Sequence, residues 1–302
     1  MASQLPFFSI IVPTFARRQQ LSNCLAGFVH LDYPRDCFEV IVVDDGDAAP
    51  PSGIIAEVAG LLDIRLVCQP HSGPASARNM GASQARGTFL AFTDDDCQPA
   101  PDWLAVLAAR LQQNPDCACG GNTINALPAN PFSTASQLLI GYLYGYYNVD
   151  REHARFLASN NFAMSKAGFS SIGGFDTTYP YAAAEDRELC DRWLQLGRRM
   201  VYAPEAIVYH AHVLDLRSFW RQHWNYGRGA YFFRRVRALR GGTRIRIEPP
   251  LFYLNLLRSP FLQTNRMSAL WLAILLGLSQ VANAAGLLSE QAFRPVQSKV
   301  HG

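Results

Sequence analysis

A repeated pattern of short apolar runs constrains the fold of residues 7–96 more than any other feature of the sequence. The runs occupy residues 7–12, 38–43, 64–68 and 89–92. They are bounded by polar or turn-forming residues and are short for helices, so each predicts a strand, and those at 7–12, 38–43 and 89–92 predict buried strands. Stretches with helical spacing separate them, such as Leu21, Leu25 and Phe28. This alternation predicts an α/β fold with a parallel sheet and right-handed crossovers.

Acidic residues follow two of these strands. Asp44 and Asp45 come after the second, and Asp94, Asp95 and Asp96 come after the fourth. Ligands bind outside the carboxyl ends of parallel strands. In an extended chain Asp94 and Asp96 point the same way, and two carboxylates suit Mg²⁺ or Mn²⁺ with phosphate completing the shell. The alternative is a solvated acidic turn that caps a helix starting near Pro101.

The composition sets broad limits. The 302 residues suffice for one large domain or a domain with an appendage, and the net charge of +3 says little by itself. Seven cysteines form no metal-like or disulfide framework, and their odd number favours a reducing compartment. The N-terminus has no basic region and Pro13 interrupts its apolar run, so we expect no signal peptide.

The middle of the chain offers a second group of acids. Glu185 and Asp186 precede Leu189 and Trp193, which lie on one helical face. The two carboxylates therefore fall at a helix N-terminus, where the helix dipole stabilises anions. Plain capping is the alternative. Residues 200–202 and 206–209 predict a short closing hairpin, and the uncharged aromatic stretch 132–147 predicts a buried helix or hairpin, or a surface that faces an acceptor.

The ordered set of motifs resembles family 2 glycosyltransferases, which have the A-type nucleotide-diphospho-sugar transferase fold. The motifs that carry the resemblance are Ile11-Val12-Pro13-Thr14, Val42-Val43-Asp44-Asp45-Gly46, Gly73 to Gly81 with Ala77-Arg78-Asn79, Asp94-Asp95-Asp96, Gly173-Gly174-Phe175-Asp176, Glu185-Asp186 and Tyr226-Gly227-Arg228-Gly229. Each is weak by itself, whereas the order is specific. One departure is Asp47-Ala48-Ala49-Pro50-Pro51, which replaces the more usual Ser/Thr-rich loop.

The resemblance implies roles for individual residues. It implies substrate-binding positions at Pro13, Thr14, Asp44, Asp45, Arg78, Asp94, Asp95, Asn160, Gly174, Trp224 and Arg228. Among them, Thr14 and Asp45 would contact the nucleotide, Asp45 through the base or ribose. Arg78 and Arg228 would lie by the diphosphate, where charge-assisted hydrogen bonds are strong.

The resemblance also implies a metal site and a catalytic base. Asp94 and Asp96 match the Asp-x-Asp metal motif, with Asp96 the main ligand and His210 completing the site for Mn²⁺ or Mg²⁺. Asp186 would be the general base, with Glu185 as its rival. One carboxylate base without an enzyme nucleophile predicts inversion at the anomeric carbon. The family favours a UDP-sugar donor.

The C-terminal third differs in composition. Residues 217–246 contain many arginines and aromatic residues but no acid, and the uncharged stretch 267–289 is long enough to span a bilayer. Ser279, Gln280 and Asn283 weaken a spanning assignment, so a monotopic helix is the alternative. We expect a catalytic domain at 1–215 and a membrane-associated segment at 216–302. The predicted location is the cytoplasmic face of the membrane, with a glycan or lipid-linked acceptor.

Two other functions deserve comparison with this hypothesis. A sugar-phosphate nucleotidyltransferase would need a Gly-rich loop with a lysine directly after the first strand, whereas Pro13-Thr14-Phe15-Ala16 stands there. A nucleic-acid-binding protein would use the arginine-rich segment, since basic and aromatic residues bind single strands. That function leaves the ordered acids unexplained, so we expect no nucleic-acid partner.

Overall fold

The computed structural model describes residues 5–179, 183–241, 247–262 and 266–293. The elements, in chain order, are β1 (Phe8–Thr14), α1 (Arg18–Val29), η1 (Arg35–Cys37), β2 (Phe38–Asp44), α2 (Ser52–Val58), β3 (Ile64–Cys68), α3 (Pro74–Gln84), β4 (Phe89–Phe92), β5 (Cys97–Pro99), α4 (Trp103–Gln113), β6 (Ala118–Asn125), α5 (Pro131–Tyr147), η2 (Arg151–His153), β7 (Phe162–Ser165), α6 (Lys166–Ser171), α7 (Glu185–Gln195), β8 (Met200–His210), α8 (Leu216–Leu239), α9 (Pro250–Arg258), η3 (Ser259–Leu262) and α10 (Arg266–Phe293).

The chain forms two compact units. The first comprises residues 1–127, 143–178 and 185–212, and the second comprises residues 128–142, 179–184 and 213–302. The first unit holds an eight-stranded sheet in the order β3-β2-β1-β4-β7-β6-β8-β5. Strands β3, β2, β1 and β4 are parallel to one another, which confirms the predicted parallel sheet.

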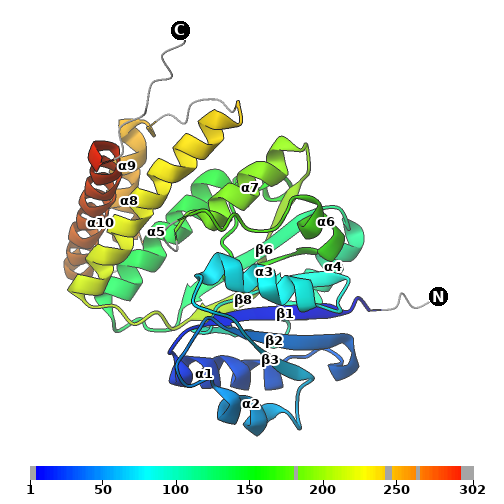
Figure 1. The fold of residues 1–302 in the computed structure, drawn as a ribbon. Helices are drawn as coiled ribbons and strands as arrows, with labels where there is room; N and C mark the ends of the chain where they lie inside the picture. The colour runs from blue at the N-terminus through cyan, green and yellow to red at the C-terminus, as the bar shows by residue number, and fades with distance from the viewer. Residues whose placement is uncertain (1–4, 180–182, 242–246, 263–265, 294–302) are drawn as a thin grey trace. The chain divides into compact units, whose positions relative to one another are not determined.

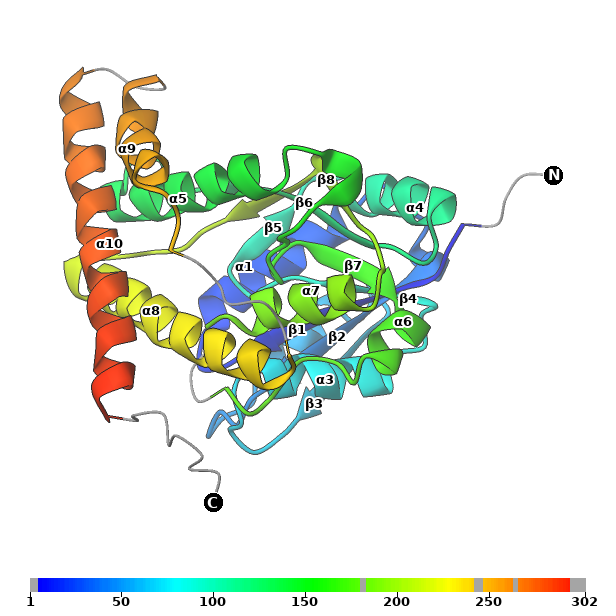
Figure 2. The ribbon, with the colours of Figure 1, turned by 90° about the horizontal axis from the view of Figure 1, so that it is seen from above.

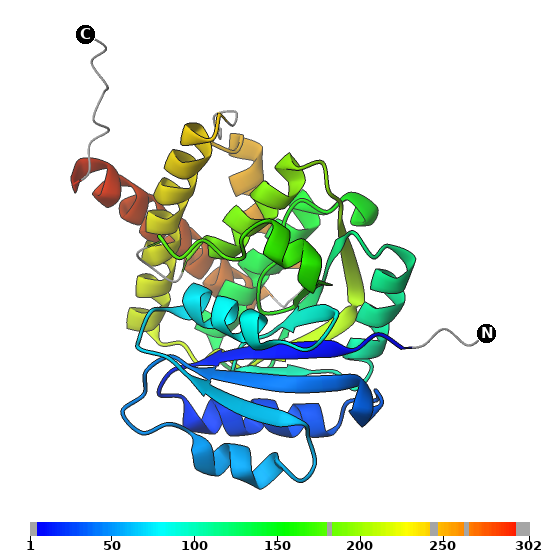
Figure 3. The ribbon, with the colours of Figure 1, turned by 45° about the vertical axis from the view of Figure 1, so that its right-hand side comes forward.

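Both faces of the parallel part are covered by helices. Figure 1 and Figure 3 show α1 and α2 on one face of β1 to β3 and α3 on the other. Ile10 and Val12 belong to the same buried cluster as Phe28 of α1. Ile11 faces α3, where a Cβ added to Gly81 would lie 2.6 Å from its Cγ2. Burial on both faces explains why β1 and β2 read as continuous apolar runs, whereas the residues of β3 are half-buried or exposed.

The second half of the sheet departs from the sequence-based expectation. Strand β7 runs antiparallel to both β4 and β6. The hairpin expected at residues 200–209 is wrong, because β8 is one continuous strand that pairs in parallel with β6 through a register shift. Asn161 fills the irregularity, since its Nδ2 donates to Asn122 O at 3.0 Å and to Ala206 O at 2.8 Å. A β-bulge therefore replaces the expected turn.

The acids after β4 lie in a turn. The N–H of Cys97 donates to the Asp94 carbonyl at 3.1 Å, and β5 begins at Cys97. The expectation that Asp94 and Asp96 point the same way in an extended chain is therefore wrong. The turn faces Asp95 and Asp96 toward one partner, Arg17, and Asp94 toward another, Arg78. Side chains alternate only where the backbone stays extended.

In the second unit, α8 and α10 pack along each other (Figure 2). A Cβ on Gly227 of α8 would lie 1.8 Å from the carbonyl oxygen of Asn283, and one on Gly286 of α10 would lie 2.0 Å from that of Trp224. These two glycines let the backbones approach more closely than any other residue would allow. The stretch 132–147, for which a helix or a hairpin was predicted, is a helix and makes up most of α5.

Helix α10 presents apolar side chains to solvent. Trp271, Ile274, Val281 and Leu288 are between 47% and 60% exposed, whereas the polar Ser279 is buried. Residues 266–292 form the helix, in the described part of the chain, that is long and apolar enough to cross a membrane. Arg244 and Arg246 of the arginine-rich segment lie outside the described residues.

Candidate active site

The carboxyl ends of β1, β2 and β4 gather polar residues at one edge of the sheet. Thr14 at the end of β1 is the register partner of Asp44 at the end of β2. The acids 94–96 directly follow β4, which pairs with the other side of β1. Pro13 stays within β1, opposite Val43, although the apolar run of the first predicted strand stops at residue 12. This edge is where ligands bind in open α/β sheets.

Arg17 bridges two of the three acids. Its Nη1 lies 3.2 Å from Asp95 Oδ1 and 3.0 Å from Asp96 Oδ2. Thr14 Oγ1 donates to Asp95 Oδ2 at 2.8 Å. Burial raises the pKa of Asp95 to about 6, although the positive charge of Arg17 opposes the rise. The two carboxylates thus already hold a cation between them.

His210 reaches Asp96 from the end of β8. Its Nε2 lies 3.2 Å from Asp96 Oδ1, and its ring stacks on His212 with the centroids 4.9 Å apart. Burial disfavours the charged form of Asp96, but the hydrogen bond and charge of His210 together with Arg17 hold the pKa of Asp96 well below its usual range. Burial and the neighbouring His210 lower the pKa of His212 to about 4.

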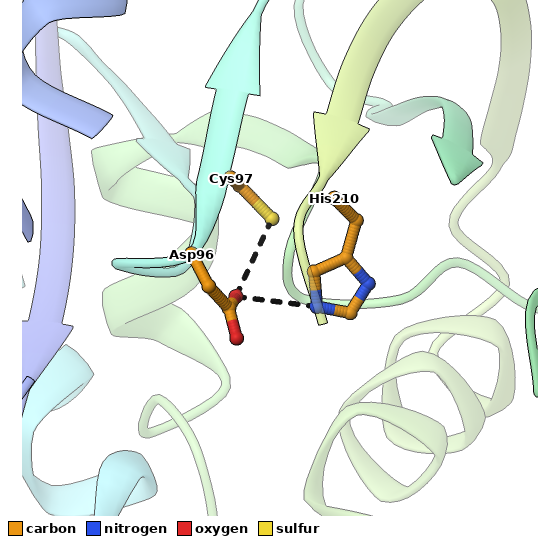
Figure 4. A group of neighbouring side chains, drawn as sticks. All are labelled: Asp96, Cys97 and His210. Atoms are coloured by element: carbon orange, nitrogen blue, oxygen red, sulfur yellow. Dashed lines mark hydrogen bonds and ion pairs between the residues drawn. The ribbon is translucent and has the colours of Figure 1, made fainter. Parts of the chain in front are cut away.

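The donor set around Asp96 fits a divalent cation. Ligand atoms of Asp96, Cys97 and His210 all lie within 4.8 Å of one another (Figure 4). Carboxylate oxygen and imidazole nitrogen are ordinary ligands of divalent transition metals. Asp94 lies apart from this group in the structure, because its Oδ1 accepts a hydrogen bond from Arg78 Nη2 at 2.6 Å.

Residues 69–73, which form the loop leading into α3, contact the Asp45 carboxylate. Its Oδ1 accepts from Gln69 Nε2 at 2.6 Å and from the N–H of Ser72 at 2.8 Å. Its Oδ2 accepts from the N–H of Gly73 at 2.8 Å and lies 2.9 Å from His71 Nδ1. These four contacts fill the acceptor sites of a carboxylate. Asp45 therefore fixes the position of this loop.

One carboxylate oxygen of Asp44 accepts no hydrogen bond from the described residues. Its Oδ2 accepts from the N–H of Asp47 at 3.2 Å, whereas its buried Oδ1 has no hydrogen-bond partner within the described residues. Burial raises the pKa of Asp44. A buried acceptor without a partner is costly unless a ligand satisfies it. Phe15 follows Thr14, the register partner of Asp44, and its exposed ring stacks on His71 with the centroids 4.4 Å apart.

Arg78 connects the acids after β4 with the acids at the start of α7. Besides Asp94, its buried guanidinium contacts Glu185 Oε1 at 3.3 Å and covers the ring of Phe175 at 5.5 Å. Burial raises the pKa of Glu185, and the charge of Asp186 adds to the rise. Burial also raises the pKa of Asp186, although the Arg187 N–H, 2.7 Å from its Oδ1, favours the charged form.

The turn at residues 173–175 is held in place from two sides. Asn79 of α3 donates to the Phe175 carbonyl and accepts from the Phe175 N–H, both at 2.8 Å. Arg192 of α7 donates to the Gly174 carbonyl at 2.6 Å. Gly174 has a φ of +70°, and a Cβ there would lie 2.5 Å from Asn79 Oδ1. Both facts require glycine at this position.

A family model described as glycosyl transferase family 2 matches residues 9–173, which is more than half of the chain. The chain belongs to glycosyl transferase family 2. The matched region includes the polar edge from Thr14 to Asp96, and it ends just before Gly174. Glu185, Asp186 and His210 lie beyond it.

Individual relatives agree with this family. The chain is 35% identical over 124 residues to glycosyltransferase AglE of Haloferax volcanii, covering 40% of this chain and 41% of that protein. It is 32% identical over 197 residues to pre-mycofactocin glycosyltransferase of Mycobacterium tuberculosis, covering 63% and 41%. The chain therefore spans about two fifths of the length of these relatives.

A solved structure shows the same fold. The mannosyltransferase PcManGT from Pyrobaculum calidifontis, in complex with GDP-Man and Mn²⁺, has a TM-score of 0.63 and 21% identity, covering 96% of this chain and 76% of that one. This similarity confirms the A-type glycosyltransferase fold expected from the motifs.

The other expected site residues have varied surroundings in this family 2 chain. Asn160 Oδ1 lies 3.4 Å from Thr123 Oγ1, a long hydrogen bond. Trp224 and Arg228 belong to the second unit, where Arg228 Nε donates to Glu290 Oε1 at 2.6 Å. No role was predicted for Arg17, Cys97 or Asn79. For Arg17 the available signal is its place three residues after the strand-ending Thr14.

Proposed function

We propose that this family 2 chain transfers a sugar from a nucleotide-diphospho-sugar to an acceptor hydroxyl with inversion at the anomeric carbon. The observation that carries the proposal is the pair of facing acid groups joined by Arg78. On one side are the acids of residues 94–96 with His210, and on the other are Glu185 and Asp186. The first group suits a metal and a diphosphate, and the second suits a base.

The nucleotide would bind at the ends of β1 and β2. Asp44 Oδ1 is buried without a partner in the described structure and offers an acceptor to an N–H of the base. Asp45 would act through the loop that it holds, since its own acceptor sites are filled. The exposed, stacked rings of Phe15 and His71 would offer a flat face to the base. We favour a UDP-sugar as the donor and retain Thr14 as a nucleotide contact.

Asp96 and His210 would hold the divalent ion, Mn²⁺ or Mg²⁺, with Asp94 and Asp95 adjoining. When bound, the ion would neutralise charge on the leaving diphosphate. Arg17 would release Asp96 as the ion enters, because both compete for the same carboxylate. Arg78 would hold Asp94 in place and lend positive charge to this side of the site.

Asp186 is the proposed general base. Glu185 is 7% exposed and paired with Arg78, which leaves it poorly placed to meet an acceptor. Asp186 is less buried than Glu185, which leaves its carboxylate more accessible to an acceptor hydroxyl. It would take the proton of the acceptor hydroxyl as the new bond to the anomeric carbon forms and the bond to the diphosphate oxygen breaks.

We propose that the second unit places the enzyme on the cytoplasmic face of a membrane as a monotopic protein. The exposed stripe Trp271, Ile274, Val281 and Leu288 is wholly apolar. Helix α8, which packs along α10, carries several arginines, including Arg221 and Arg228. If α10 spanned the membrane, these arginines would be drawn toward the hydrocarbon. Placing each charge there would cost about 3 kcal/mol or more. An interfacial helix avoids that cost.

The location favours a lipid-linked or polysaccharide-precursor acceptor. In that case Trp224 and Arg228, together with residues 131–142 of α5, would belong to the unit that meets the acceptor. The seven cysteines are all free thiols, which agrees with a reducing compartment.

Calorimetric titration with UDP, GDP and dTDP, each with and without Mn²⁺, tests the donor site. We expect metal-dependent binding of UDP that the Asp96→Ala variant loses. Arg18→Gln, which changes an exposed neighbour outside the acid group, is the matched control. If no nucleotide binds under any condition, the proposed transferase activity is wrong. Tight binding of GDP in place of UDP would keep the reaction and change the donor.

A further inference from the structure

The metal-binding group at Asp96 contains a thiol. Strand β5 pairs with β8 in antiparallel register, and Cys97 is directly opposite His210. Directly opposite residues of an antiparallel pair project from the same face, with their Cβ atoms about 5 Å apart. Cys97 and His210 therefore approach each other because of the strand pairing, and Asp96 joins them from the adjacent turn (Figure 4).

Two of the three donor separations are close to those of ligands on one ion, and the third is within 4.8 Å. Asp96 Oδ1 lies 3.2 Å from His210 Nε2 and 3.9 Å from Cys97 Sγ. Ligands at zinc distances of about 2.0–2.3 Å in a tetrahedron lie about 3.3–3.8 Å from one another. Cys97 is fully buried, whereas the His210 side chain is 18% exposed. An ion would therefore enter past His210.

We infer that Asp96, Cys97 and His210 form a site that prefers Zn²⁺ or Co²⁺ to Mn²⁺ and Mg²⁺, with Cys97 as a thiolate ligand. A thiolate is a soft ligand and selects zinc, whereas Mn²⁺ and Mg²⁺ prefer oxygen. On binding, the Sγ–metal bond forms and the thiol proton leaves to water. The fourth position stays open for water or a phosphate oxygen, as in zinc sites that retain an exchangeable ligand.

This inference rests on the proposed function only in placing the ion at the donor site, where Zn²⁺ would compete with Mn²⁺. Cys97 follows the acids in sequence, but its place as a ligand depends on the pairing of β5 with β8. Cys24 provides a comparison, since its buried Sγ lies 3.5 Å from the Asp94 carbonyl oxygen and outside the three-donor group.

Absorption spectroscopy with Co²⁺ alone tests the ligand directly. Wild-type protein should develop a sulfur-to-cobalt charge-transfer band in the near ultraviolet, and Zn²⁺ should abolish it. Cys97→Ser should lose the band and bind Zn²⁺ about tenfold or more weaker, with Mn²⁺ affinity little changed. Cys24→Ser should behave as wild type. Cobalt binding without the band overturns the inference.

X-ray absorption of the Zn²⁺-loaded wild-type protein keeps the test independent of whether Cys97→Ser folds. A zinc–sulfur shell at about 2.3 Å supports the inference, and a shell of oxygen and nitrogen only at about 2.0–2.1 Å rejects it. Neither result depends on nucleotide. If Mn²⁺-dependent UDP binding persists while the sulfur shell is missing, the thiolate site is wrong and the transferase proposal stands.

Discussion

Arg78 of α3 and Glu185 at the first residue of α7 form an ion pair, with Nη1 3.3 Å from Oε1. The same guanidinium lies 2.6 Å from Asp94 Oδ1. One buried cation therefore joins the acids that follow β4 to the acids that begin α7. Its position fixes the distance between the two groups, so catalysis and stability should both depend on it.

Replacing Arg78 with Met should destabilise the protein by about 3 kcal/mol, because breaking a buried ion pair leaves a carboxylate without a partner. Arg78→Lys keeps the charge but loses the second contact, so we expect about half that loss. Denaturant unfolding of both variants measures the effect. A loss below about 1 kcal/mol for Arg78→Met would contradict a structural role of the pair.

Asp186→Asn should abolish sugar transfer while nucleotide binding stays within about threefold of wild type, since the base acts only in the chemical step. Glu185→Gln is the matched change one residue earlier, and it should reduce the rate less. Single-turnover rates and calorimetry separate the two effects. A larger rate loss for Glu185→Gln would transfer the base assignment to Glu185, and loss of nucleotide binding in Asp186→Asn would reject it.

The transfer rate should rise with pH above the usual titration range of an aspartate, because burial raises the pKa of the proposed base, Asp186. The base works only when it is ionised, so the rate below its pKa should fall about tenfold per pH unit. A kcat profile with an apparent pKa at or below that of an ordinary aspartate would contradict this expectation.

Stability should depend on pH in the opposite sense to the transfer rate, because of Glu185. A carboxyl whose pKa is higher in the folded state binds more protons there than in the unfolded chain. The free energy of unfolding contributed by Glu185 should therefore fall as the pH rises from about 4.5 to about 7. Comparing the unfolding of wild type and Glu185→Gln across this range isolates the contribution.

Removing Arg17 should tighten metal binding. Its guanidinium holds Asp95 and Asp96 in the structure, so an entering ion must displace it. Arg17→Gln should therefore raise the affinity for Mn²⁺ by a few fold, about 1 kcal/mol for a half-exposed pair. Arg18→Gln, at the next residue, should leave the affinity unchanged. Weaker Mn²⁺ binding in Arg17→Gln would show that Arg17 supports the ion instead of competing with it.

The apolar face of α10 should bind lipid. Substituting Trp271 and Ile274 with Glu should weaken binding to anionic vesicles by about 2 kcal/mol, or about 30-fold, because both side chains are exposed and apolar. Leu61→Glu and Leu196→Glu change equally exposed leucines of the first unit and serve as controls. Flotation with vesicles measures binding. Unchanged flotation of the double variant would reject the lipid-facing role.

The sequence alone determined the parallel half of the sheet. Residues buried on both faces produce continuous apolar runs, and the helices between them have their own periodicity, so β1 to β4 follow from local patterns. The same patterns place acids after β2 and β4. They also indicate the glycine turn at residue 174 and the acids at the start of α7.

Only the tertiary structure decided which side chains share a partner. Arg17 meets Asp95 across 78 positions of sequence, and Arg78 meets Glu185 across 107. The turn at residues 94–97 separates Asp94 from Asp96, and the pairing of β5 with β8 brings Cys97 to His210. Local periodicity carries no information on such contacts, because they depend on the register of strands and on turns far apart in the chain.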